Sequence, residues 1–290
     1  MKVTLSEYAG FCDGVKRAYD IVEKISKDSD VKKPVVVLGS LVHNTDVVNR
    51  IKKIGIGKID FDGDIEKIKK EIDDNIGTLV VTAHGIGPEI FDIAKEKGID
   101  VVDTTCPKVI KVQRLAQVFL KRGYQIVIIG EKKHKEVQGI HGWSNKKAFI
   151  VEGKDEVDEL KLDENEKIVV ISQTTQNKDW VDEIAAAICK KYPKAKMYNT
   201  VCDTTKNRQS EVVDIARNND VVFVIGSPES SNSNRLYEIA KAENPNTHFV
   251  ERINDINESW IEGKNSAGVT AGASSPNWVI NEIVEYLKKY

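Results

Sequence analysis

The 290-residue sequence contains no apolar run long enough to cross a membrane, and its longest apolar runs have the length of one strand. Its first residues, MKVTLSEYAG, lack the apolar core of a secretory signal peptide. Neither charge sign is in excess, because the formal net charge is −2, which argues against broad binding to nucleic acid or other polyanions. We therefore expect a cytoplasmic protein with no nucleic-acid and no membrane partner.

Motifs for nucleotide binding and for structural zinc are also lacking. No GxGxxG follows a predicted strand and no GxxxxGK[ST] occurs, so nucleotide cofactors are not indicated. The chain has four cysteines and no CxxC pair, which is the usual source of ligands for structural zinc. In a cytoplasmic chain of this length, four cysteines indicate ligands, nucleophiles or core thiols rather than a disulfide framework.

Short β-branched runs alternate with amphipathic, charged segments along most of the chain. Continuous apolar strands are typical of parallel sheets with helices on both faces, so the pattern predicts an α/β fold. The length exceeds what one compact core usually takes. Strands are predicted at 34–40, 78–83, 98–104, 124–130, 147–152, 167–173, 220–226, 247–251 and 266–272. Helices are predicted at 14–27, 45–53, 88–97, 107–122, 177–191, 207–218, 233–243 and 276–289, and 57–77 reads as exposed helix and loop.

Three solitary cysteines recur at a regular spacing. Cys12 and Cys106 are 94 residues apart, and Cys106 and Cys202 are 96 apart. Each precedes a predicted helix that has a basic residue within five positions. The spacing predicts three similar parallel-sheet α/β units, each contributing one cysteine. We expect them at 14–102, at 103–198, and at 199–290 together with 1–13.

Three such cysteines are compatible with a zinc site, a set of nucleophiles or iron–sulfur ligands. A nucleophilic cysteine needs one thiol beside a base, whereas iron–sulfur clusters are normally held by four thiolates. Three thiolates would leave one iron without a protein ligand and able to bind a substrate oxygen. The fourth cysteine, Cys189, falls on the apolar face of a predicted helix with Ile184 and Ile188, so we expect a packed core thiol without a ligand role.

Polar side chains gather after the predicted strands, where ligands of parallel sheets bind. The segments SSNSNRL and GASSPNW each place hydroxyl groups at the start of a predicted helix, and free N–H groups there bind phosphate. Any one such serine is more often an N-cap, and any one such histidine is more often structural. As a set with His43, His84 and His134, they predict a site for a small dianion such as a diphosphate.

Glu136 lies two residues after His134 in the charged stretch EKKHKE. A carboxyl group close to phosphate and to a metal cluster should have a raised pKa and could deliver protons. A solvated surface glutamate is the equally weighted alternative.

Eight motifs in a fixed order connect the sequence with a known family. They are LVHN, AHG, TCP, HKEVQG, SQTT, CDTTKNRQ, SSNSNRL and GASSP, and the match runs from GFCDGVKRA to GVTAGASSPNW, which is nearly the whole chain. In this set and order the sequence resembles the 4-hydroxy-3-methylbut-2-enyl diphosphate reductase family, which catalyses the last step of the non-mevalonate isoprenoid pathway. The resemblance implies an oxidoreductase that reductively dehydroxylates this diphosphate to isopentenyl and dimethylallyl diphosphate.

The resemblance also implies a site. It implies a trefoil of three α/β units around a central [4Fe–4S] cluster with one iron lacking a protein ligand, and electrons from ferredoxin or flavodoxin. Cys12, Cys106 and Cys202 match the cluster ligands. Glu136 matches the proton donor, and Thr174 matches the residue that positions the substrate hydroxyl and relays its proton; His134 belongs to this catalytic group and to the next set. The diphosphate-binding residues are matched by His43, His84, His134, Thr174, Ser230, Ser231, Asn232 and Ser274.

Six positions depart from the family pattern without removing a ligand or the acid. They are Lys108, Ile110, Gln113, Lys135, Ile140 and Thr204. The first three put in doubt the hydrogen bonding around Cys106, and Lys135 and Ile140 put in doubt the stiffness of the Glu136 loop.

Two other classes of protein stay open at this point. A zinc-dependent phosphatase could use the same junction residues and would contain zinc without iron or sulfide. A non-catalytic iron–sulfur sensor would bind a cluster but would not turn over substrate, which would leave Glu136 and the serine clusters without a role.

Overall fold

The fold is described from a computed structural model, in which residues 1–61 and 64–290 are described. The chain forms two compact units. Unit 1 comprises Met1–Lys16, Val42–Asn49 and Cys202–Tyr290, and unit 2 comprises Arg17–Leu41 and Arg50–Val201. The two N-terminal helices, α1 (Asp13–Lys27) and α2 (Thr45–Lys53), each have residues in both units.

Unit 1 is built on one parallel four-stranded sheet in the order β1-β12-β10-β11. The strands are β1 (Lys2–Leu5), β10 (Val221–Ile225), β11 (Thr247–Val250) and β12 (Ser266–Ala271). The helices are α8 (Asp203–Arg217), α9 (Ser231–Glu243) and α10 (Asn277–Leu287), with two 3₁₀ turns at Ile253–Asp255 and Glu258–Trp260.

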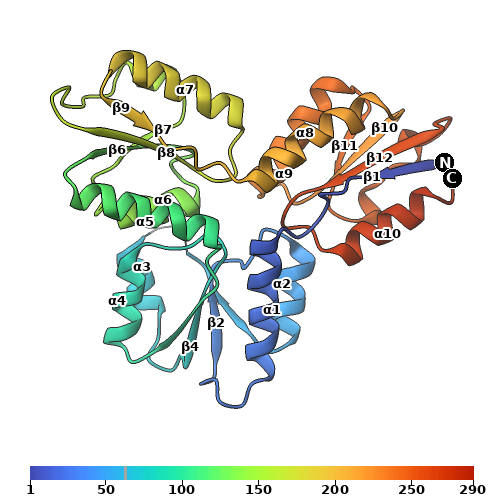
Figure 1. The fold of residues 1–290 in the computed structure, drawn as a ribbon. Coiled ribbons are helices and arrows are strands. Elements are labelled where there is room, and N and C mark those ends of the chain that lie inside the picture. The colour runs from blue at the N-terminus through green and yellow to red at the C-terminus, as the bar shows by residue number, and fades with distance from the viewer. Residues whose placement is uncertain (62–63) are drawn as a thin grey trace. The chain divides into compact units, whose positions relative to one another are not determined.

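The central strand β10 shows why this sheet is covered on both faces. Phe223 packs into a core that includes α10, whereas its neighbours Val222 and Val224 pack into a core with α8 and α9. Successive side chains of a strand point to opposite faces, so the uninterrupted run VVFVI fills both cores. Figure 1 shows α10 on one side of this sheet and α8 and α9 on the other.

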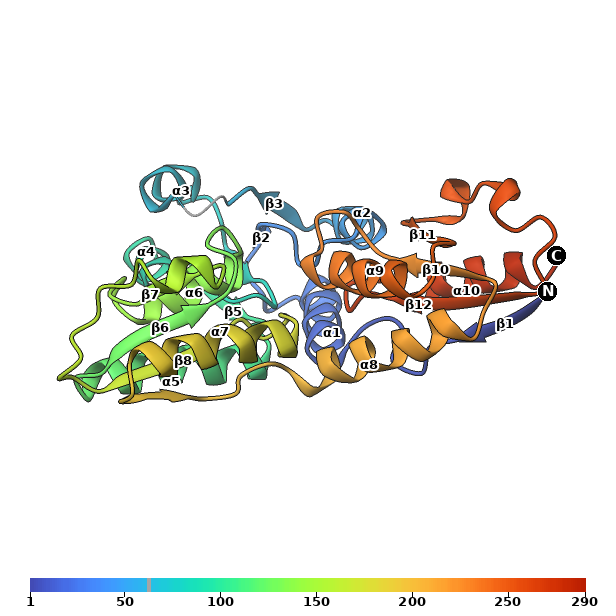
Figure 2. The same ribbon diagram turned by 90° about the horizontal axis from the view of Figure 1, so that it is seen from above.

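Unit 2 contains two parallel four-stranded sheets, in the orders β3-β2-β4-β5 and β7-β6-β8-β9. The strands are β2 (Val35–Leu38), β3 (Gly57–Ile59), β4 (Thr78–Val81), β5 (Asp100–Asp103), β6 (Gln125–Ile129), β7 (Phe149–Val151), β8 (Ile168–Ser172) and β9 (Ala195–Met197). The helices are α3 (Ile65–Glu71), α4 (Pro88–Glu96), α5 (Pro107–Lys121), α6 (Lys135–Trp143) and α7 (Lys178–Lys191), with a 3₁₀ turn at Asp155–Val157. Helix α7 packs on one face of the β6–β8 strands and α5 and α6 pack on the other, as Figure 1 shows, and Figure 2 gives the same elements from above.

The three sheets share one strand order. With β1 counted after β12, the first strand of each sheet lies in the second place and the next strand along the chain forms the edge beside it. The remaining two strands follow on the other side. In unit 1 the fourth place is taken by β1, which pairs with β12 from Lys2 opposite Ser266 to Leu5 opposite Val269. The predicted α/β class with parallel sheets is therefore confirmed, and N-terminal residues complete a sheet otherwise built from the C-terminal part of the chain.

All nine predicted strands are present, whereas three short edge strands, β1, β3 and β9, were not predicted. The eight predicted helices are present too, with α8 beginning at Asp203 rather than 207. The prediction was wrong at α6, because the segment after His134 is a helix rather than a loop. Among the described residues, no helix has both the length and the apolar character that crossing a membrane requires.

Candidate functional site

The three recurring cysteines each stand directly before the first residue of a helix, as their spacing predicts. Cys12 precedes α1, and Cys106 and Cys202 are the N-cap residues of α5 and α8. All three side chains are partly exposed, and none of the three forms a disulfide. Each carbonyl oxygen accepts a hydrogen bond from the backbone N–H four residues later, from Lys16 (2.8 Å), Ile110 (2.9 Å) and Lys206 (3.0 Å).

In unit 1, helix α8 holds the segments of two of these cysteines. It begins directly after Cys202, and its Glu211 carboxylate accepts hydrogen bonds from the Ser6 hydroxyl and from the backbone N–H of Glu7 (2.7 Å). One turn earlier, the Arg208 guanidinium donates to the carbonyl oxygen of Gly10. The residues that lead to Cys12 are therefore fixed to the helix that Cys202 caps.

The two serine clusters of unit 1 come together at the ends of the neighbouring strands β10 and β12. Ser230 is the N-cap of α9, and its Oγ accepts from the Ser233 backbone N–H (3.3 Å) and hydroxyl (3.0 Å). The Ser274 hydroxyl donates to the same Oγ at 3.4 Å, across 44 positions of sequence. Ser231 is the first residue of α9. Hydroxyl groups and helix N–H groups thus meet at one point, as an oxyanion requires.

Two asparagines in unit 1, Asn44 and Asn232, have a buried side-chain NH₂ group that makes no hydrogen bond. Asn232 is 7% exposed, and its Nδ2 makes no hydrogen bond. The Nδ2 of Asn44 is in the same state, although its Oδ1 accepts from the Val47 backbone N–H (3.1 Å). The adjacent His43 places its Nδ1 3.5 Å from the Glu229 carboxylate. Buried donors normally have acceptors, so these amides indicate an acceptor of another molecule. Sequence reasoning missed Asn44, although it follows His43 directly.

In unit 2, Glu136 and Thr174 form a buried acid–hydroxyl pair. Glu136 is 1% exposed in the first turn of α6, and Thr174 is 4% exposed after β8. The Thr174 backbone N–H donates to Glu136 Oε1 at 2.6 Å, and its hydroxyl donates to Oε2 at 3.0 Å. Burial raises the pKa of Glu136 to about 7, against the opposing effect of the two Thr174 hydrogen bonds. The alternative of a solvated surface glutamate is therefore wrong.

Two of the predicted histidines lie together beside this pair. His134 is the N-cap of α6, and its Nδ1 accepts from the Glu136 backbone N–H at 3.2 Å, which assigns the ring proton of the neutral form to Nε2. The His84 and His134 rings meet edge to face with centroids 5.8 Å apart, and His84 Nδ1 is 3.5 Å from the Thr82 hydroxyl. Contacts within unit 2 thus link His84, which follows β4 of one sheet, with His134, Glu136 and Thr174, which follow β6 and β8 of the other.

The Cys106 segment is fastened to the His84 segment by the backbone. The Cys106 N–H donates to the carbonyl oxygen of Ala83 at 3.0 Å, and Thr104 pairs with Val81 at 3.1 Å in the same way. Since Ala83 directly precedes His84, one ladder of hydrogen bonds positions both the cysteine and the histidine.

Two of the departures from the family pattern, Gln113 and Ile140, are accommodated within unit 2. Gln113 is buried and donates to the carbonyl oxygen of Ile86 at 3.4 Å, which also accepts from the Trp143 indole at 3.0 Å. Ile140 is fully buried in the core that α5 and α6 share. These contacts tie α5 and α6 together and hold the Glu136 segment in a packed helix.

Cys189 is only partly the core thiol that we expected. It lies at the margin of the apolar face of α7, where it is half-buried and its thiol donates to the Ala195 carbonyl oxygen at 3.7 Å. Burial raises the pKa of this thiol. Within each unit, no three described His, Cys, Asp or Glu side chains are grouped to hold a single metal ion.

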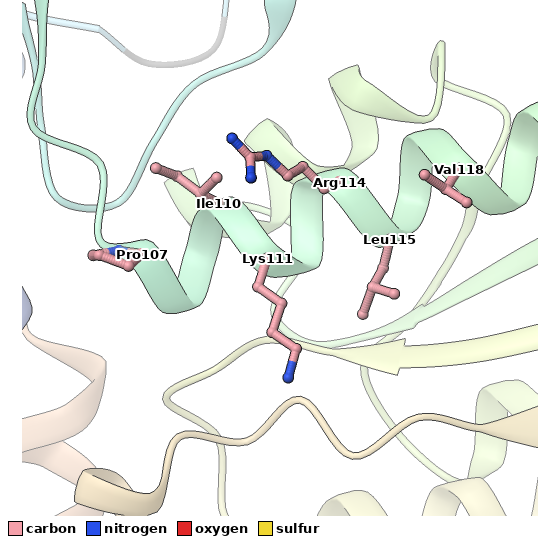
Figure 3. Close-up of a pocket in the computed structure, with 6 residues that line it drawn as sticks. All are labelled: Pro107, Ile110, Lys111, Arg114, Leu115 and Val118. Carbon is pink, nitrogen blue, oxygen red and sulfur yellow. The ribbon is translucent and has the colours of Figure 1, made fainter.

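Two open grooves lie along α5, the helix that Cys106 caps, and none of the predicted site residues lines them. One has a volume of about 400 Å³ and is drawn in Figure 3, where Lys111 and Arg114 extend from the helix. It is lined by Pro107, Ile110, Lys111, Arg114, Leu115 and Val118. The other has a volume of about 300 Å³ and is lined by Phe91, Asp103, Ile110, Gln113, Arg114, Gln117 and Trp143.

Comparison with known proteins gives consistent matches over the full chain. A family model described as LytB protein matches residues 3–288. The chain is 36% identical to the 4-hydroxy-3-methylbut-2-enyl diphosphate reductase of Caldanaerobacter subterraneus subsp. tengcongensis, over 99% of this chain and 97% of that protein. It is also 36% identical to the protein of the same name from Aquifex aeolicus, over 97% of this chain and 94% of that protein.

Two solved structures resemble the fold. The E-1-hydroxy-2-methyl-but-2-enyl-4-diphosphate reductase from Plasmodium falciparum has a TM-score of 0.88 and 31% identity, covering 98% of this chain and 87% of that one. A (E)-4-hydroxy-3-methyl-but-2-enyl diphosphate reductase, described as the terminal enzyme of the non-mevalonate pathway, has a TM-score of 0.72 and 34% identity, with both chains fully covered.

Proposed function

The chain belongs to the LytB protein family, and we propose that it reductively dehydroxylates 4-hydroxy-3-methylbut-2-enyl diphosphate to isopentenyl and dimethylallyl diphosphate. The observation that carries this proposal is the buried Glu136–Thr174 pair, a carboxyl group with a pKa of about 7 hydrogen-bonded to a hydroxyl group. Such a pair is a proton source at neutral pH, which removal of a hydroxyl group as water requires.

We propose that Cys12, Cys106 and Cys202 hold a [4Fe–4S] cluster with one iron free of protein ligands. Two observations support the fit. The three thiols form no disulfide and stand at helix N-termini, where the helix dipole favours anionic ligands. Arg208, on the helix that Cys202 caps, has buried N–H groups without acceptors. When bound, the cluster would supply single electrons and an iron that accepts the substrate oxygen.

The chain's own residues would bind the substrate through its diphosphate group. In unit 1 the donors are the N-terminus of α9 with Ser230, Ser231 and Ser274, and the unpartnered amide of Asn232. His43 in unit 1, and His84 and His134 in unit 2, complete the proposed set. Because neutral His134 carries its proton on Nε2, it would donate to an oxyanion without a change of charge.

Glu136 and Thr174 would move the proton. Thr174 donates to the ionised carboxylate, as in the structure; once Glu136 is protonated, the acid can donate to the Thr174 oxygen, which leaves the threonine proton to pass on. The net change is that the substrate takes up two electrons and two protons and loses its hydroxyl group as water. A single hydrogen is added to carbon, at one end of the allyl unit or at the other.

The electron donor that we propose is a small acidic carrier protein such as ferredoxin or flavodoxin. Helix α5, which begins directly after Cys106, has the sequence PKVIKVQRLAQVFLK with four basic residues and no acidic residue. Lys111 and Arg114 are exposed along its groove (Figure 3). Exchanging both for glutamate should lower the rate with the carrier protein and leave the rate with a small chemical reductant unchanged. The proposed compartment is the cytoplasm, whose reducing conditions keep thiol ligands free.

The test is anaerobic purification, determination of iron and sulfide, and turnover of the hydroxylated diphosphate with a chemical reductant. We expect iron, sulfide and both products. Glu136→Gln should keep the cluster but lower turnover by about 10²–10⁴-fold. Zinc without iron or sulfide would replace this proposal by a phosphatase, a cluster without turnover would replace it by a sensor, and near-normal turnover of Glu136→Gln would remove the proton-donor role.

A further inference from the structure

Arg208 is a buried cation that the preceding mechanism does not use. Among the described residues, Glu136 and Arg208 are the charged side chains in the buried class, and Arg208 is 2% exposed. Its Nη2 donates to the Gly10 carbonyl oxygen, whereas Nε and Nη1 are buried and make no hydrogen bond. Leaving N–H groups of a charged side chain without acceptors in a protein interior is strongly unfavourable. An acceptor that the polypeptide does not itself provide is therefore required.

The neighbours of Arg208 show where that acceptor lies. The ionisable groups close enough to influence the guanidinium electrostatically are Cys12, Cys202 and Glu211. Burial is the largest influence on the pKa of Arg208 and lowers it, and these three groups act against it. The Glu211 carboxylate already accepts from the Ser6 hydroxyl and from the N–H groups of Glu7 and Tyr8, and it forms no ion pair with Arg208. Cys12 and Cys202 therefore remain as the ionisable side chains close to the unpartnered guanidinium nitrogens.

We propose that Arg208 donates its Nε and Nη1 hydrogens to sulfur atoms of the cofactor bound at Cys12 and Cys202, and thereby sets the cofactor's reduction potential. This inference rests on the proposed iron–sulfur cofactor. Hydrogen bonds to the sulfurs and the local net charge are the protein's means of tuning such a potential. A fixed positive charge stabilises the reduced, more negative state more than the oxidised one, so Arg208 makes electron uptake easier.

The side-chain type agrees with this role. A planar guanidinium can hold the Gly10 carbonyl oxygen with one nitrogen and still direct two other nitrogens elsewhere, which a single ammonium group does less well. Arg208 therefore positions the Cys12 segment and faces the cofactor with the same group. Substrate phosphate is the other anionic acceptor, and the experiment separates it from sulfur.

The experiment uses the full-length protein, purified anaerobically with its cluster, and three variants. Arg208→Met removes the charge and the donors at similar length. Arg208→Lys keeps the charge with a different donor geometry. Arg217→Met is the matched control, because Arg217 ends the same helix, is exposed and is paired with Glu243 at 2.8 Å. The measurements are iron and sulfide per chain, the rate of iron loss to a chelator, the reduction potential by a spectroscopic titration, the iron–sulfur stretching bands in H₂O and D₂O, and the dissociation constant of the diphosphate substrate.

We expect Arg208→Met to shift the potential to a more negative value, to lose iron faster and to lose the deuterium sensitivity of the stretching bands. In all three measurements Arg208→Lys should give values between those of Arg208→Met and the wild type, and Arg217→Met should give the wild-type values. An Arg208→Met protein with an unchanged potential and unchanged bands overturns the inference, as does a change confined to substrate affinity, which would assign Arg208 to phosphate. If Arg208→Met does not fold by circular dichroism, Arg208→Lys decides by the same readouts. If the wild-type protein contains no cluster, the proposed function is wrong. That outcome is distinct from a wild type that has a cluster whose potential does not depend on Arg208.

Discussion

Replacing Glu136 by glutamine should remove a pH dependence from the stability of the protein. The carboxyl group is 1% exposed, and both of its oxygens accept hydrogen bonds from Thr174. Glutamine has the same shape and can accept from the Thr174 N–H, while the threonine hydroxyl turns to accept from the new amide. The substitution therefore removes a titrating group and leaves the packing in place.

The magnitude follows from the shifted pKa. Burial raises the pKa of Glu136 from an ordinary value of 4.5 to about 7, so the folded state binds more protons than the unfolded state between these values. For a carboxyl group with a raised pKa, the stabilisation is complete below about pH 4.5 and is lost as the pH rises through about 7. At about 1.4 kcal/mol per pH unit the full loss is about 3 kcal/mol, and about 2.5 kcal/mol of it falls between about pH 5 and about pH 8.

The assay is the free energy of unfolding of both proteins in denaturant at several pH values, under anaerobic conditions. Taking the difference between wild type and Glu136→Gln at each pH cancels the contributions of all other titrating groups. The free energy of unfolding of the variant should increase relative to that of the wild type as the pH rises, and the difference should level off above about pH 8. A difference that stays constant across this range would show that the buried carboxyl group does not titrate near neutrality, and the proton-donor role would lose its physical basis.

Three further substitutions test other parts of the structure. Cys189→Ser should leave iron and sulfide per chain unchanged, and loss of either would show that this half-buried thiol is a ligand. Ser230→Ala removes the N-cap of α9 and should lower the free energy of unfolding by about 1 kcal/mol and weaken substrate binding, measured by denaturation and by calorimetry. Gly272→Ala places a methyl group against the Ser233 side chain and should cost about 1–3 kcal/mol; unchanged stability would contradict that close packing.

The sequence predicted the features that depend on one repeated physical rule. A strand buried on both faces must be apolar throughout, so runs such as VVFVI at Val221–Ile225 identified nine strands and the α/β class. Carboxyl ends of adjacent parallel strands meet at one edge, so the prediction of gathered polar groups was confirmed within unit 1 for Ser230 and Ser274, which follow the neighbouring strands β10 and β12. His84 and His134 also meet within unit 2, although they follow strands of two different sheets.

Features that arise from long-range packing were not predictable in this way. Helix α6 was missed because Gly139 and Gly142 are poor helix formers, and it exists because Val137 and Ile140 fill a core shared with α5. The burial of Arg208 is equally invisible in KNRQSEVVD, where it reads as an exposed residue of a charged helix. The short strands β3 and β9 carry a lysine at the centre of three residues and form only by pairing at a sheet edge.

The placement of β1 has a consequence for how the protein folds during its synthesis on the ribosome. Among the described strands β1 pairs with β12 alone, so the first strand to emerge has no partner until Ser266–Ala271 has been synthesised. At about 5–20 residues per second this delay lasts roughly 13–50 s. Cys12 lies between β1 and α1, in a segment that α8 holds at Glu7 and Gly10, so a nascent chain carries this thiol on an unanchored segment for nearly the whole of its synthesis. Assembly of the proposed cluster on all three thiols would therefore follow translation.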